Sequence, residues 1–151
     1  MTFRHFFVEN LQVSCYNEFR KRKGDIKMSA ERQNEHQKQI DFNIVSALHS
    51  IGIPINMRGY HYLRDAITIS IGNDAVIGCI TKMIYPEIAK KHRASSPSVE
   101  RAIRNAIWAA WERGAGPIFA QRYNYHGNNK PSNSEFIACI AEEIYLNIKY
   151  S

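Results

Sequence analysis

The stretch SSPSVERAIRNAIWAAW, residues 95–111, decides the fold class because it has the composition of a helix with two different faces. At about 100° per residue, one side of such a helix carries small or branched apolar residues: Val99, Ala102, Ile103 at its edge, Ala106 and Ala110. The opposite side gathers charged and polar residues: Glu100, Arg101, Arg104 and Asn105. The alanines predict close packing on a neighbouring helix, and the polar side predicts a surface that projects from the protein.

The second half of this helix changes character. Beyond Asn105 the polar side is taken over by large apolar residues: Ile107, Trp108 and Trp111. We therefore expect the first half to project into solvent and the second half to be enclosed. A recognition helix of a DNA-binding protein has this shape, because its first turns enter a groove while its far end anchors in the core.

The residues before this helix complete a helix-turn-helix pattern. A short helix is predicted at Pro86–His92, a turn at Arg93–Ser96 and the long helix at Pro97–Arg113. Ser96 is the expected N-cap, since Pro favours the first helical position that follows it. A glycine often found in such a turn is absent, and Arg93 lies near that place.

The rest of the chain also has helical periodicity. Apolar residues recur at helical spacing in five further segments, residues 40–51, 57–71, 75–85, 117–123 and 133–149. No convincing strand is found, since ITISI at 67–71 continues a helical period. We predict an all-α fold, a compact bundle of about six helices within a domain at residues 40–151. Residues 1–39 are an extension of unknown role, in which 24–39 is a linker or an exposed helix.

Composition excludes several classes of protein. The chain has 151 residues, 44% of them hydrophobic, which is enough for one domain with a core. It has no apolar run long enough for a transmembrane helix and no secretory signal pattern. Its three cysteines are far apart and its histidines are scattered, so we expect neither disulfides nor a metal or other cofactor. We expect a cytoplasmic protein that is not an enzyme.

The excess positive charge is concentrated in residues 82–104. The formal net charge is +6, and residues 82–104 hold six basic residues against two acidic ones. Residues 42–81 and 105–151 are each balanced. This pattern indicates a polyanionic partner, with a solvated basic helix face as the alternative. A second basic run, Arg20–Lys23, is either a nucleic-acid arm or a solvated helix end.

The polar side of the long helix has side chains suited to reading base edges. Arg pairs with guanine, Glu accepts from cytosine and Asn pairs with adenine. The alternative is that Glu100 and Arg104 form only an i,i+4 ion pair on a solvated helix. Phosphates could be contacted by the free N–H groups at the helix start and by neighbouring basic and hydroxyl side chains: Lys82, Lys90, Lys91, Ser95, Ser96 and Ser98.

Several stretches in their present order resemble a known family. These are GIP at 52–54, RGYHYLRDAI at 58–67, GCITKMIYPEIAKKH at 78–92, SVERAIRNAI at 98–107, W-x-R-G at 111–114 and KPSNSEFIA at 130–138. Together they resemble the C-terminal effector domain of the stage-zero sporulation master response regulators of endospore-forming Firmicutes. The resemblance implies a six-helix domain that binds a TGTCGAA-containing box in double-stranded DNA, often in tandem, and contacts an RNA polymerase sigma factor.

Carried over by position, the resemblance assigns base contacts to Glu100, Arg101 and Arg104, with Asn105 beside them where the family can have His. Ser98 stands where the family commonly has an Arg, and one lost bidentate contact costs about 1–3 kcal/mol. Residues 114–129 differ from the family's segment linked to sigma-factor contact. The first 39 residues are too few for a receiver domain, so we expect no control by phosphorylation.

The resulting hypothesis is a sequence-specific transcription regulator that binds double-stranded DNA in the cytoplasm, in association with the nucleoid. Its further expected partners are a sigma factor and, on tandem boxes, a second copy of itself; no membrane is expected. The alternative is an interaction protein that modulates a full-length sporulation regulator or RNA polymerase without reading DNA. No nucleophile–base pair or phosphate-binding glycine loop supports an enzyme.

Overall fold

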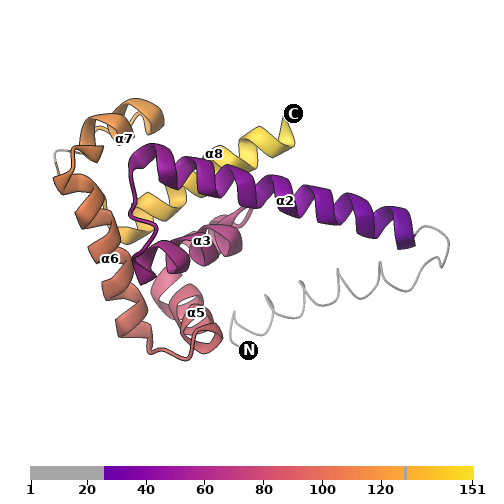
Figure 1. Ribbon diagram of the computed structural model, residues 1–151, viewed down its shortest axis with the longest axis horizontal. Helices are drawn as coiled ribbons and strands as arrows, with labels where there is room; N and C mark the ends of the chain where they lie inside the picture. Colours follow the sequence, from indigo (N-terminus) through magenta and orange to yellow (C-terminus); the bar gives the residue numbers. More distant parts are fainter. Residues whose placement is uncertain (1–25, 128) are drawn as a thin grey trace. The chain divides into compact units, whose positions relative to one another are not determined.

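The computed structural model describes residues 26–127 and 129–151, and every regular element in these residues is a helix (Figure 1). The all-α prediction is therefore confirmed. The chain divides into two units, Met1–Gln39 and Ile40–Ser151. The basic run at 20–23 and Cys15 lie outside the described residues.

Helix α2, Ile26–Ile51, belongs to both units. Residues 29–39 are all exposed, so of the two interpretations of 24–39 the exposed helix holds for its described part. After residue 40 the pattern changes, and four apolar side chains are almost fully buried: Ile44, Ala47, Leu48 and Ile51. Gly52 ends the helix with a φ of +86°, a backbone conformation that glycine adopts readily.

Helices α3, Arg58–Ser70, and α6, Ser96–Glu112, pack closely against each other. At Gly59 a Cβ atom would overlap the backbone carbonyl of Ala102 and lie 2.8 Å from the Cβ of Ala106. Val99, Ile103 and Ala106 are fully buried. The prediction that small residues bring this helix close to a neighbour is confirmed, and the neighbour is α3.

The segment before the helix-turn-helix differs from the prediction of one helix at 75–85. It is broken into a short helix α4, Asp74–Ile77, and a π-helical segment η1, Ile80–Ile84. The π-helical segment continues directly into α5, Tyr85–Lys91. Pro86 has no N–H to donate to a carbonyl four residues back, and the wider turn lies immediately before it.

Two further helices complete the second unit. Helix α7, Ala115–Tyr123, and helix α8, Asn133–Lys149, meet where the ring of Phe119 stacks on that of Phe136 at 5.2 Å. Helix α8 begins with a capping box, since Ser132 and Glu135 each bond to the other's backbone N–H. Within this unit α6 runs along one side, with α5 at one of its ends and α7 at the other (Figure 1).

Candidate nucleic-acid interface

Helices α5 and α6 form a helix-turn-helix with a tight turn at residues 92–95. The N-cap of α6 is Ser95, whose side chain accepts from the N–H of Ser98 at 3.3 Å, so the predicted cap at Ser96 is wrong by one residue. Arg93 has a φ of +53°. It occupies the left-handed position after α5 that glycine usually takes, at the place where the sequence lacked one.

The four predicted base-contact residues lie together on the outer face of α6, at its N-terminal half. Arg101 and Asn105 are exposed. The side chains of Arg104 and Glu100 are 55% and 39% exposed. The opposite face of the same turns is buried against α3, so these four side chains lie on the side of α6 that faces away from α3.

Glu100 and Arg104 form the i,i+4 ion pair that was the alternative to base contact. An exposed pair of this kind is worth only about 0.3–0.5 kcal/mol, so it does not prevent either side chain from exchanging its partner for a base edge. The pair also orients the Arg104 guanidinium along the outer face. Its presence is therefore compatible with both interpretations.

The predicted phosphate contacts are not equivalent in the structure. Lys82 and Lys90 are exposed, as are Ser95 and Ser98, while Ser96 is half-buried. Lys91 differs, because its Nζ donates to Asp65 Oδ1 at 2.6 Å. Of the two adjacent lysines, Lys91 would have to exchange an ion pair to reach a phosphate, whereas no ion pair holds Lys90 within the described residues. The start of α6 also has fewer free backbone N–H groups for a phosphate than expected. Pro97 has no N–H, and the N–H of Ser98 donates to the side chain of Ser95.

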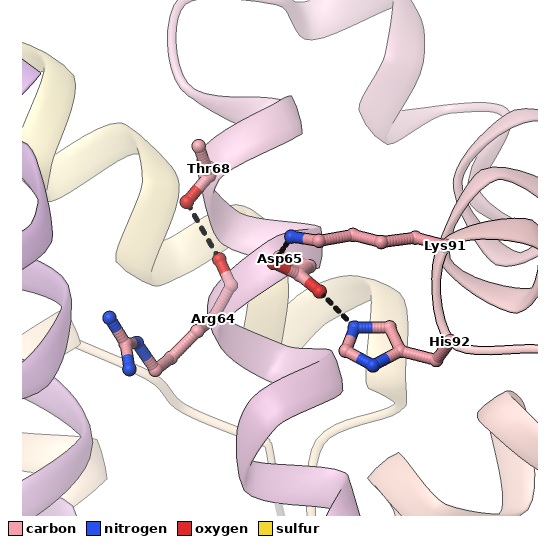
Figure 2. A network of polar contacts seen from close by, with 5 residues as sticks. All are labelled: Arg64, Asp65, Thr68, Lys91 and His92. Carbon is pink, nitrogen blue, oxygen red and sulfur yellow. Dashed lines mark hydrogen bonds and ion pairs between the residues drawn. The ribbon is translucent and has the colours of Figure 1, made fainter.

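Asp65 on α3 binds the end of α5, just before the turn (Figure 2). His92 Nε2 donates to Asp65 Oδ2 at 2.5 Å, and Lys91 occupies the other carboxylate oxygen. Burial opposes ionisation of Asp65, but the hydrogen bonds and charges of Lys91 and His92 outweigh it and lower its pKa. The Asp65 carboxylate, on α3, thus holds the end of α5 in place.

A second fixing point joins α8 to the start of α6. The buried Nδ2 of Asn133 donates to the backbone carbonyl of Glu100 at 3.1 Å and to the hydroxyl of Tyr85 at 3.0 Å. Burial raises the pKa of Tyr85 above its ordinary value, against the hydrogen bond from Asn133. Sequence reasoning missed this residue, because its two partners lie 48 and 33 positions away in the chain.

Trp108 contradicts the expectation that the second half of α6 is enclosed. Ile107 is fully buried and Trp111 partly so, but Trp108 is 54% exposed. It follows Arg101 by seven residues, about two helical turns, and therefore lies on the same outer face. Lys130, from the segment before α8, places its Nζ 5.7 Å from the centre of the Trp108 ring. The seven-residue spacing from Arg101 was enough to predict that Trp108 lies on the outer face, but its apolar character pointed to burial.

Other kinds of site find no support in the described part of the chain. Within residues 26–127 and 129–151, no group of three His, Cys, Asp or Glu side chains is placed to hold a metal ion. In the same residues no helix is long and apolar enough to cross a membrane.

An all-α unit with an exposed, basic second helix, fixed at its turn by a neighbouring helix, defines the class of helix-turn-helix DNA-binding domains. The family model described as the C-terminal domain of sporulation initiation factor Spo0A matches residues 44–144, and the chain belongs to this family. The resemblance found in the sequence is thereby confirmed. The protein is a DNA-binding regulator of the sporulation-initiation type, with double-stranded DNA as its partner.

Proposed function

We propose that this protein reads a TGTCGAA-like box in the major groove with the outer face of α6. The observation that carries the proposal is the contrast within one helix. Arg101, Arg104 and Asn105 are exposed on turns whose other side, Val99 and Ile103, is fully buried. A rigidly held helix with a free basic face is what insertion into a groove of about 12 Å width requires.

In this proposal the arginines supply most of the discrimination. Arg101 makes a bidentate contact to guanine O6 and N7, and Arg104 exchanges its bond with Glu100 for a second base edge. Glu100 then accepts from a cytosine amino group or continues to orient Arg104. Lys90, Lys82 and the serines around the turn contact phosphates, which fix the helix in its register without carrying sequence information.

We propose further that the 151-residue chain binds the box without phosphorylation, because its own α5–α6 arrangement is fixed by contacts inside the second unit. Asp65 and Asn133 supply these contacts. The expected association with the nucleoid follows from DNA binding alone.

The test is a titration of the full-length, unphosphorylated protein against two duplexes that differ only in whether the box is intact or scrambled. We expect tighter binding to the intact box, with an affinity that falls as salt rises by a slope of about −0.9 for each phosphate neutralised. Equal affinity for both duplexes would overturn specific readout and leave the interaction-protein alternative.

Two further partners belong to the same proposal and rest on the family resemblance. A duplex with two boxes in tandem is expected to bind two copies, and a sigma factor is expected to be retained by the protein on its box. Sedimentation of the complexes measures both. If only one copy binds a tandem duplex at saturation, the proposal that two copies occupy tandem boxes is wrong.

A further inference from the structure

The segment that leads into α8 lies beside the recognition helix and is firmly held there. Asn133 bonds to the backbone of Glu100, and Pro131 is buried. Lys130 is therefore fixed next to α6, with its ammonium group over the ring of Trp108. This Lys is only half-buried, so the charge still reaches solvent.

The positive charges on this face are incompletely neutralised. Glu100 pairs with Arg104, whereas within the described residues no carboxylate pairs with Lys130. Burial and the nearby Arg104 both lower the pKa of Lys130 below its ordinary value. Lys130 is thus a cation held at an exposed aromatic ring, close enough to Arg104 for the two charges to repel, and an arriving anion would relieve this repulsion.

The position of this cluster relative to the base-reading face indicates which anion. Trp108 lies seven residues beyond Arg101 on the same face, about 10.5 Å along the helix axis. The major groove is about 12 Å wide. Because the N-terminal turns of a recognition helix contact the bases, a group about two turns further along the helix lies toward the sugar–phosphate strand that borders the groove.

We propose that Lys130, positioned by the ring of Trp108, binds a backbone phosphate at the edge of the groove that α6 enters. The inference rests on the proposed function, because it needs α6 in the groove. It adds a contact from outside the helix-turn-helix, and it gives the exposed Trp108 a positioning role rather than a base contact.

The experiment compares full-length wild type, Lys130→Gln and Lys130→Arg on the intact and scrambled duplexes at several salt concentrations. At about 0.15 M salt one phosphate contact is worth about fivefold in affinity, and its loss reduces the salt slope by about 0.9. We expect Lys130→Gln to show both changes on both duplexes, with the ratio between the duplexes unchanged. Lys130→Arg should restore the slope.

Lys149→Gln is the matched control, because Lys149 also lies over an aromatic ring, 5.5 Å from that of Tyr145, at the opposite end of α8. It should leave affinity and slope unchanged. Trp108→Ala should reduce the slope as Lys130→Gln does, and Trp108→Phe should retain most of it. Loss of packing alone would change thermal stability but not the salt slope.

A salt slope for Lys130→Gln equal to that of wild type overturns the inference. If wild type still prefers the intact box in that case, the proposed function stands and only the Lys130 contact fails. If wild type binds both duplexes equally, specific readout fails, and the slope of Lys130→Gln still decides on the phosphate contact. Absence of binding to either duplex overturns both.

Discussion

The inner and outer faces of α6 differ in burial although they belong to the same helix: the inner face is packed against α3 and the outer face is exposed. On the inner face Val99, Ile103 and Ala106 are fully buried, and Gly59 of α3 leaves no room for a methyl group. On the outer face Arg101 is exposed and Trp108 is 54% exposed. Changes on the inner face should therefore act on folding, and changes on the outer face should act on DNA binding.

Gly59→Ala should have the largest effect and acts entirely on the inner face. The new Cβ would overlap the Ala102 carbonyl, which is backbone and cannot swing away. We expect a loss of about 3 kcal/mol or more in the free energy of unfolding, measured by chemical denaturation. Gly78→Ala is the control, since its Cβ would be 3.8 Å from the nearest atom and should cost nothing. Equal stability of the two variants would contradict close packing of α3 on α6.

Arg101→Ala should produce the opposite result on the outer face. The loss of one bidentate contact is worth about 1–3 kcal/mol, so affinity for the intact box should fall roughly 5- to 150-fold. The free energy of unfolding should change by less than about 0.5 kcal/mol, because the side chain is exposed. Arg113→Ala, which removes the same charge at the C-cap of α6, is the control and should retain box preference.

Asp65→Asn tests the contact that holds the end of α5. It should lower the free energy of unfolding by about 1 kcal/mol near neutral pH, because two partly exposed hydrogen bonds to charged groups are weakened. The pKa of Asp65 is lowered in the folded protein, so its contribution is present above the ordinary value of 3.8 and is lost as pH falls through the lowered value. The free energies of unfolding of wild type and variant, measured from about pH 7 downward, should therefore begin to approach each other once the pH falls below 3.8. A difference that stays constant with pH would point to a packing effect instead.

Arg93→Gly should have the smallest effect. Relief of a left-handed backbone conformation, with a φ of +53°, should be offset in part by the greater freedom of glycine in the unfolded chain. We expect a gain of less than about 1 kcal/mol, visible as a small rise in Tm. A fall in Tm would show that the Arg93 side chain contributes to the folded turn.

Sequence periodicity was sufficient for the fold class and for the face of α6 that projects, because both depend on which residues repeat every three or four positions. It is wrong at Trp108, whose apolar character predicts burial although its spacing from Arg101 places it on the exposed face. It also could not find Asp65 with Lys91 and His92, or Lys130 with Trp108. Those contacts join residues more than 20 positions apart, and only tertiary packing brings them together.

The central claim, that the outer face of α6 reads bases, is tested most directly by changing each base pair of the box in turn. Affinities of wild type and Arg101→Ala are measured for every duplex of this series. We expect wild type to lose about 1–3 kcal/mol at each contacted pair, and Arg101→Ala to lose discrimination at one guanine while keeping it elsewhere. A uniform weakening on all duplexes, with every preference of the wild type retained, would show that Arg101 contacts only phosphates and would contradict the account.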